Sequence, residues 1–285
     1  MRRLKTVCIS ALTWSLLASV TAGASGAPTG EYAQFKACPL RLAAVNDCVY
    51  SLTDDGSFTI GKRTVPIKNP LVLQGGFEGE EDRIRFFGAE NGETLVKSPQ
   101  PVPGGLTGVS APGWWPSFLQ EWFNQEIGSG HTQVKATVEL TGPNSGLTDI
   151  QLNTENLLNQ KGLALGLPVK FHLESPLLGS NCYIGWESNP VQLDFTTGSD
   201  GNLQGVSGES TFNKQFTITT IADGKLVNNS FKAPRAEGCG GIYSFFIDPL
   251  INSILGVPSG SGKNSAIFEG KLQDALAEYV KKASG

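Results

Sequence analysis

The 285-residue sequence lacks the common signatures of a hydrolytic active site. It contains two histidines, His131 and His172, and no Gly-x-Ser-x-Gly motif of the kind that presents an activated serine. His131 follows the glycine-rich turn 128–130, which indicates a loop residue. His172 occupies a polar position in an alternating pattern, so we expect it to face solvent or a polar groove. The sequence identifies no catalytic residue and predicts a protein that does not depend on histidine chemistry.

Metal and cofactor signatures are also absent. No Cys-x-x-Cys pair and no grouping of Cys with His has the spacing of a zinc site, and the acidic run 78–82 lacks EF-hand spacing. The loop 256–264 is similar to a phosphate-binding loop, but its first glycine is one residue out of register. Asn264 also stands where such a loop has the Ser or Thr that binds Mg²⁺. We predict no metal and no cofactor, and we interpret both segments as turns, the second of them flexible.

The N-terminus predicts export. A basic start, residues 1–5, precedes an apolar run, 8–20, that is too short to span a bilayer comfortably. Ala22-Gly23-Ala24 then provides the small residues that a signal peptidase recognises. We therefore predict a signal peptide at 1–24, a single exported domain at 25–285 and no stable membrane span after cleavage. The expected location is secreted or extracellular, with a loose association with the cell envelope left open.

The sequence has too few basic residues to bind a strongly negatively charged partner. Removing the three basic residues of the signal from the 22 of the whole chain leaves 19, against 26 Asp and Glu, a net charge of about −7. A chain of this charge is repelled by phosphates, which argues against nucleic acid and anionic membrane surfaces as partners.

Four cysteines remain in the mature chain: Cys38, Cys48, Cys182 and Cys239. An even number in an exported protein indicates two disulfides, although three connectivities are possible. We expect each cysteine to pair with its neighbour in sequence, Cys38 with Cys48 and Cys182 with Cys239.

The residue pattern predicts an all-β fold. Apolar and polar residues alternate strictly over 169–173 and 191–195, with turn residues between the runs, and the chain has 35 Gly and 16 Pro. We expect a mostly antiparallel barrel or sandwich with two or three short helices. Helices are expected at 116–127, at 244–255 with a break or a start at Pro249, and at 274–282. We expect hairpin turns at 54–56 and 200–202, and a loose entry segment at 25–48 that is tied down by a small loop if Cys38 bonds Cys48. Pro66 places the strand around it at an edge or a bulge.

Tryptophan is concentrated in one segment. Trp114, Trp115 and Trp122 are three of the four tryptophans that remain after the signal. The helix that follows Trp115 has an apolar face at helical spacing, made by Phe118, Leu119, Trp122, Phe123 and Ile127. One interpretation is that the whole segment is buried against the β core. The other, which we favour for Trp114 and Trp115, is that adjacent side chains at a turn diverge and at least one lines a cleft or the surface. We assign ligand binding to these two residues and expect Trp115→Ala to behave as a surface substitution.

Three runs carry a resemblance to a known group of proteins. They are Thr64–Ile67 leading to Leu73-Gln74-Gly75-Gly76, then Leu178–Gly185, and then Gly262-Lys263-Asn264 before Ala266. In these runs, and over most of the mature chain, the sequence resembles an uncharacterised family of secreted actinobacterial proteins. The resemblance implies export and a shared fold. It implies no catalytic residue, because no activity is assigned to that family.

Three classes of function follow from these observations. The first is an exported non-enzymatic β-domain that binds an apolar or cell-envelope ligand, or an envelope partner, so that the expected partners are an envelope lipid, glycan or protein. The second is a secreted hydrolase with an unrecognised carboxylate or Ser/His site, because paired carboxylates are defined by a distance across the fold. The third is a structural surface protein. A closed apolar cavity lined from the Trp segment would favour the first class. A polar cleft that holds His172 or two facing carboxylates would favour the second, and a solid core without a pocket would favour the third.

Overall fold

The computed structural model describes residues 26–79, 83–103, 105, 113–126 and 134–285, with the backbone alone for 122–126. The predicted signal peptide lies outside this range. Strands dominate the described residues, and every strand pairing among them is antiparallel. The strands form two main sheets that do not close on each other, so the prediction of an antiparallel all-β fold is confirmed and the sandwich is the form it takes.

The first sheet, sheet A, has the strand order β14-β15-β17-β1-β3-β4-β7, with β2 paired to β1. Its strands are β14 (Glu209–Asn213), β15 (Ile218–Asn228), β17 (Ser265–Leu276), β1 (Asp47–Ile60), β2 (Arg63–Pro66), β3 (Leu71–Glu78), β4 (Arg85–Gly88) and β7 (Gly146–Leu147). The second, sheet B, has the order β16-β10-β9-β6-β5, with β11 and β8 also paired to β9. Its strands are β16 (Ala236–Glu237), β10 (Tyr183–Ile184), β9 (Leu165–Glu174), β6 (Lys135–Leu140), β5 (Gln100–Pro101), β11 (Val191–Phe195) and β8 (Gln151–Leu152). A small hairpin, β12 (Ser199–Asp200) and β13 (Leu203–Gln204), stands apart.

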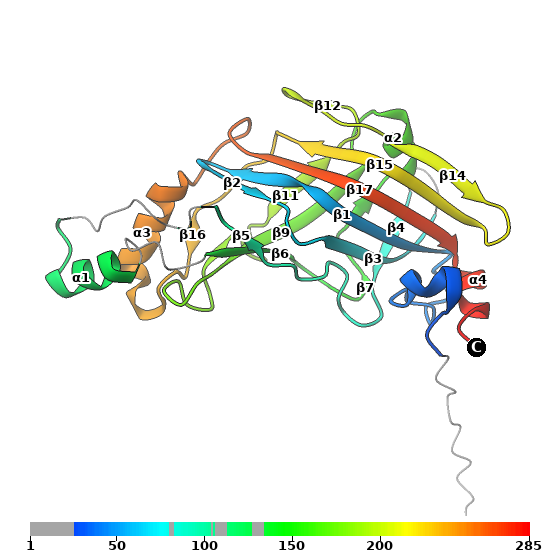
Figure 1. Ribbon diagram of the computed structural model, residues 1–285, viewed down its shortest axis with the longest axis horizontal. Coiled ribbons are helices and arrows are strands. Elements are labelled where there is room, and N and C mark those ends of the chain that lie inside the picture. Colours follow the sequence, from blue (N-terminus) through cyan, green and yellow to red (C-terminus); the bar gives the residue numbers. More distant parts are fainter. Residues whose placement is uncertain (1–25, 80–82, 104, 106–112, 127–133) are drawn as a thin grey trace, which may run out of the picture.

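In the described part of the chain, four α-helices lie around the sheets and two 3₁₀ turns accompany them. They are α1 (Ser117–Glu126), α2 (Thr154–Asn159), α3 (Ser244–Leu255), α4 (Ala277–Lys282), η1 (Gly30–Phe35) and η2 (Gly241–Tyr243). Figure 1 shows α1 and α3 together at one end of the molecule and α4 at the other, with β15, β17 and β1 running side by side between them.

Aromatic side chains join the two sheets. Phe58 of β1 meets Phe171 of β9 edge to face at a centroid distance of 5.3 Å, and it meets Phe268 of β17 at 5.2 Å. Phe268 in turn lies 4.5 Å from Phe195 of β11. These rings belong to one continuous buried core with residues from both sheets. The inward positions of β9 are Val169, Phe171 and Leu173, so the strict alternation in the sequence marks a strand with one face in the core, as predicted.

Both predicted disulfides are confirmed. The sulfur atoms of Cys38 and Cys48 are 2.01 Å apart, and those of Cys182 and Cys239 are 1.97 Å apart. The first bridge ties the entry segment to β1, where Phe35 of η1 is buried in a second core cluster with Val280 of α4. The entry segment is therefore tied down, as expected for the case in which Cys38 bonds Cys48, and the buried Phe35 fixes it further.

The sequence misplaced three local features. Residues 54–56 form a bulge within β1 and not a hairpin turn: the register with β17 shifts between Thr53 and Asp55, and any side chain at Gly56 would collide with the Ile267 carbonyl. Helix α4 begins at Ala277 and not at 274, because β17 is paired on both sides as far as Ala275. Helix α2 was not predicted. It has only six residues, and its N-cap is Asn153, whose side chain accepts a hydrogen bond from the Asn156 N–H at 2.8 Å.

The other local expectations agree with the structure. Strand β2, which contains Pro66, pairs only with β1, so it lies off the main path of sheet A as an edge strand should. The turn at 200–202 joins β12 to β13. Helix α3 matches its predicted bounds, but the break or start expected at Pro249 is wrong, because the helix continues through this residue.

Candidate apolar binding site at the helical end

Exposed apolar side chains gather where α1 and α3 meet. Trp114 is 69% exposed, Phe118 61%, Ile242 90% and Phe245 81%. Tyr243 adds a fifth exposed side chain. We call these five residues the aromatic tip. Large apolar side chains are costly to leave in water, and a group of them on a monomer typically marks a site of interaction.

Ring contacts join the two segments that build the tip. Phe246 of α3 lies with its ring centroid 6.5 Å from that of Trp114 and 6.1 Å from that of Trp115, and Phe245 is 5.2 Å from Phe246. Phe246 is half-buried and packs on the main core. The exposed rings therefore rest on a buried base and are not carried by a free loop.

The structure separates the two tryptophans assigned to ligand binding. Trp114 is exposed, as one of the pair was expected to be, but Trp115 is 3% exposed and belongs to the core with Leu119. Gln120 reinforces this turn, since its Nε2 donates to the Trp115 carbonyl at 2.7 Å. The expectation that Trp115→Ala is a surface substitution is therefore wrong, because its ring faces α3 and the core.

Helix α1 has the predicted position, but one residue of its predicted apolar face is turned outward. Phe118 was grouped with Leu119, and only Leu119 is buried. Adjacent residues of a helix point about 100° apart. An apolar face that includes both Phe118 and Leu119 is therefore wide enough to reach from the core to solvent. The side chains of Trp122 and Phe123, and the whole of Ile127, lie outside the described residues.

Helix α3 is held against sheet B by hydrogen bonds at its start and middle. The Asp248 carboxylate accepts from the backbone N–H of Cys239 at 2.7 Å and from that of Gly238 at 3.2 Å. Asn252 forms a pair of bonds with the backbone of Ala236 in β16, at 2.7 and 2.8 Å. The Cys182–Cys239 bridge ties the same segment to the chain just before β10. These contacts bury Ile247, Ile251 and Ile254 and thereby turn Phe245 outward.

Sequence reasoning missed Ile242, Tyr243 and Phe245 as members of the site. The run 242–247, Ile-Tyr-Ser-Phe-Phe-Ile, is apolar at more positions than one helix face can bury. That excess was the available signal, but the sequence alone does not show which of the residues lie outside.

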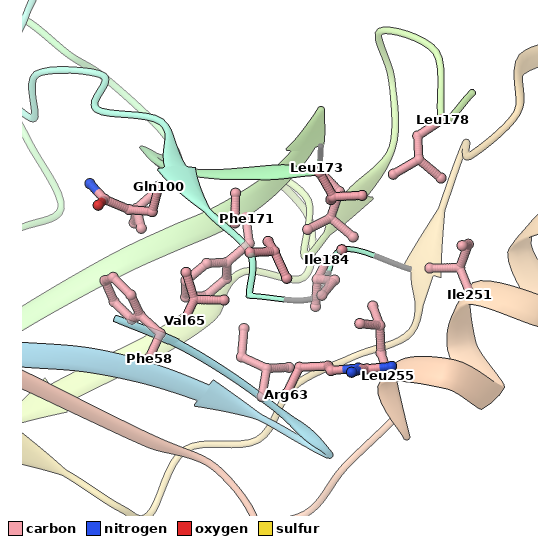
Figure 2. A pocket seen from close by; sticks show the side chains of 16 residues that line it. Phe58, Arg63, Val65, Gln100, Phe171, Leu173, Leu178, Ile184, Ile251 and Leu255 are labelled. Carbon is pink, nitrogen blue, oxygen red and sulfur yellow. The ribbon is translucent and has the colours of Figure 1, made fainter. Parts of the chain in front are cut away.

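A narrow apolar cavity lies behind the tip, between the two sheets and α3. Figure 2 shows Phe58 of β1, Phe171 of β9 and Ile184 of β10 gathered there, with Ile251 and Leu255 from α3. Its polar lining includes Gln100, whose side chain is occupied by bonds to the backbone of Lys68, Asn69 and Ser98. The space wide enough for the centre of a water molecule is about 40 Å³. A lipid chain does not fit in this space as it stands, so the exposed tip is a better candidate for a binding surface than the cavity.

A charged cluster covers the outer face of sheet B, around His172. The His172 ring is stacked on Tyr183 at 4.4 Å, and its Nδ1 lies 3.6 Å from a Glu139 oxygen. Glu139 also pairs with Lys97 at 2.9 Å, and this hydrogen bond raises the pKa of Lys97 above its ordinary value. Burial, and then the Glu139 charge, raises the pKa of Tyr183.

The contacts of this cluster are those of a row of ion pairs and not those of a catalytic triad. The nearby hydroxyl of Thr137 donates to Glu174 at 2.6 Å and not to His172. On the same face Lys170 pairs with Glu187 at 2.9 Å and lies 5.1 Å from the centroid of Tyr183. His172 was expected on a polar face, and it lies on one, with 14% of its side chain exposed. His131 lies outside the described residues.

Asn264 fixes the loop that was interpreted as a flexible turn. Its buried side chain accepts from Gly61 N–H at 3.0 Å and from the Ser259 hydroxyl at 2.6 Å, and it donates to the Phe231 and Gly260 carbonyls, each at 3.0 Å. The expectation of flexibility is wrong, because this one amide ties the loop to Gly61, just after β1, and to Phe231.

The described residues contain neither a membrane-spanning helix nor a cluster of metal ligands. No helix there combines the length and the apolar character that crossing a bilayer requires. No group of three or more His, Cys, Asp or Glu side chains there is placed to hold a metal ion. Comparisons of the chain with protein-family models, with curated proteins and with solved structures found no match.

Proposed function

We propose that this chain is an exported, non-enzymatic β-sandwich that binds lipid of the cell envelope through its aromatic tip. The observation that carries the proposal is the exposure of Trp114, Phe118, Ile242 and Phe245 together at one end of the molecule. Export is supported by the predicted signal and by two disulfides, which persist in oxidising compartments.

The chemistry of the tip favours a lipid surface over a glycan or a protein groove. Its side chains are uncharged, and Trp and Tyr are the residues that settle at the boundary between hydrocarbon and water. The tip is formed by α1, α3 and the residues just before each helix, at the end of the sandwich, so it can enter an interface without displacing the sheets. A net charge of about −7 for the mature chain leaves apolar insertion, and not attraction to anionic headgroups, as the driving force.

The expected affinity is modest. Full burial of one such side chain contributes roughly 1.5–3 kcal/mol, so four partly exposed ones contribute on the order of 4–8 kcal/mol before the costs of association. This amount supports reversible binding to a membrane surface and not permanent anchoring.

The test is flotation of the protein with vesicles of uncharged phosphatidylcholine. We expect the protein to float with the vesicles, with little change between low and high salt. Trp114→Ala combined with Phe245→Ser is expected to lower the partition coefficient at least tenfold. Phe212→Ser is the matched control, because Phe212 is 57% exposed and lies on β14, away from the tip.

Two results would contradict the proposal. One is wild-type protein that stays with the buffer at every lipid concentration. The other is a tip variant that floats as well as the Phe212→Ser control.

A further inference from the structure

A second cleft opens at the far end of the sandwich, between sheet A and α2. It lies at the first residues of β1, Asp47 and Val49, whereas the last residue of β1, Ile60, lines the cavity behind the tip. Its free volume is about 350 Å³, which is within the range of small-molecule sites. Figure 1 shows α2 and β14 at this end, away from α1 and α3.

The walls of the cleft are mostly apolar. Leu152, Leu157 and Leu158 line it from sheet B and α2, and Phe77, Ile221 and Leu272 line it from sheet A. Leu157 is buried in a core cluster of its own, and Leu158 remains 49% exposed at the rim. A hydrocarbon chain in the cleft would therefore cover apolar surface that now faces water.

Two carboxylates stand on the floor of this apolar cleft. Asp274 of β17 is paired in register with Val49 of β1 and with Thr219 of β15, so it points to the same inner face of sheet A as both. Asp47 is two residues before Val49 and shares that face. Burial raises the pKa of Asp274 above its ordinary value, and a hydrogen bond from Thr219 opposes this only in part. Among the described residues that line the cleft there is no Lys or Arg.

We propose that this cleft binds an amphiphilic amine, with its ammonium group at Asp274 and its hydrocarbon chain against Leu157 and Leu158. A cationic head would form a charge-assisted hydrogen bond with the Asp274 carboxylate, which is partly removed from water, and such a bond is stronger there than at an open surface. A fatty acid of the same length would place a second negative charge beside that of Asp274. A fatty alcohol would fill the apolar part without the charge. We therefore expect the amine to bind most tightly, the alcohol less tightly and the fatty acid least tightly.

The site is separate from the aromatic tip and does not rest on the proposed function. The tip is formed by residues 114–118 and 242–245, and none of them lines the cleft. Substitutions at the two ends therefore distinguish the two proposals.

The experiment is isothermal titration with decylammonium, decanol and decanoate, each below its micellar concentration, at neutral pH and constant ionic strength. The full mature chain carries Trp114→Ala and Phe245→Ser, so that binding at the tip does not contribute. We expect decylammonium to bind at least tenfold more tightly than decanol, and decanoate to bind more weakly than decanol. Asp274→Asn is expected to abolish the preference for the amine over the alcohol. Leu158→Ser is expected to weaken the binding of both.

Asp194→Asn is the matched control, because Asp194 is an exposed carboxylate on β11 that does not line the cleft. It is expected to leave all three affinities unchanged. The inference is overturned if decanoate binds as tightly as decylammonium, if no ligand binds, or if Asp274→Asn retains the preference for the amine. It is also overturned if amine binding is seen with an intact tip and disappears in the tip variant.

Discussion

Trp114 and Trp115 are consecutive residues whose rings meet edge to face, with centroids 6.2 Å apart, yet the first is 69% exposed and the second 3%. The chain bends here just before α1, so one ring packs on α3 and the core while its neighbour stays at the surface. The first prediction concerns this difference. Trp115→Ala is expected to cost about 3–5 kcal/mol of the free energy of unfolding, the usual range for emptying a large buried site. Trp114→Ala is expected to cost less than about 1 kcal/mol, as a surface change does.

Urea denaturation followed by circular dichroism measures both changes on the same scale. If Trp114→Ala destabilised the protein as much as Trp115→Ala, the exposed ring would have a role in folding, and its place in a binding surface would lose support.

The second prediction compares the two disulfides. The Cys182–Cys239 bridge closes a sequence separation of 57 residues, and the Cys38–Cys48 bridge closes one of 10. In the chain-entropy model, bridges of these lengths stabilise by roughly 4 and 2.7 kcal/mol. Replacing both cysteines of the longer loop by alanine is therefore expected to lower the urea midpoint more than the same change in the shorter loop.

The longer bridge also holds the segment that precedes η2 and α3. Its removal is therefore expected to reduce vesicle binding, whereas removal of the shorter bridge is not. A larger loss of stability in the Cys38/Cys48 double variant would show that loop length does not govern the difference.

The third prediction concerns the amide of Asn264. Its four good hydrogen bonds are made in a buried site, so Asn264→Ala leaves several backbone groups without a partner. We expect a loss of roughly 2–4 kcal/mol in the free energy of unfolding. Asn91→Ala, which removes an exposed amide that bonds only near its own position in the sequence, is the control and is expected to cost less than about 1 kcal/mol. Equal effects of the two substitutions would contradict the role assigned to Asn264.

The fourth prediction uses two carboxylates whose pKa values move in opposite directions. Burial raises the pKa of Asp274, so its ionised form destabilises the folded state at neutral pH. This penalty fades as the pH falls through the raised folded pKa and is absent below the ordinary value of about 3.9. Asp274→Asn is therefore expected to raise the urea midpoint at pH 7 and to leave it nearly unchanged at pH 3.

Glu187 is the opposite case. Its carboxylate accepts from the Gly142 backbone N–H at 2.6 Å and from Lys170 at 2.9 Å, and these bonds lower its pKa. The stability that they contribute is present above the ordinary pKa of about 4.3 and is lost as the pH falls through the lowered folded value. Glu187→Gln is therefore expected to lower the midpoint at pH 7 and to have less effect at pH 3. Parallel pH profiles for the two variants would contradict both assignments.

The sequence by itself determined the class of fold, because the alternation of apolar and polar residues is a local property of each strand. Val169, Phe171 and Leu173 could be assigned to a buried face without knowledge of their partners, since successive side chains of a strand point to opposite faces. The disulfide pairing was also predicted correctly from four cysteines and their order in the chain.

Only the tertiary structure decided which apolar residues are left exposed. More apolar residues lie around Trp115 and Phe246 than the helices can bury. Asp248 and the Cys182–Cys239 bridge hold α3 in place, and this placement leaves Trp114 and Phe245 exposed. The cleft depends in the same way on pairing between distant strands, because Asp274 reaches the face of Val49 through the register of β17 with β1. Contacts between residues far apart in the chain determine which side chains stay exposed and which ones meet in the cleft. The local periodicity of the sequence carries no information about such contacts.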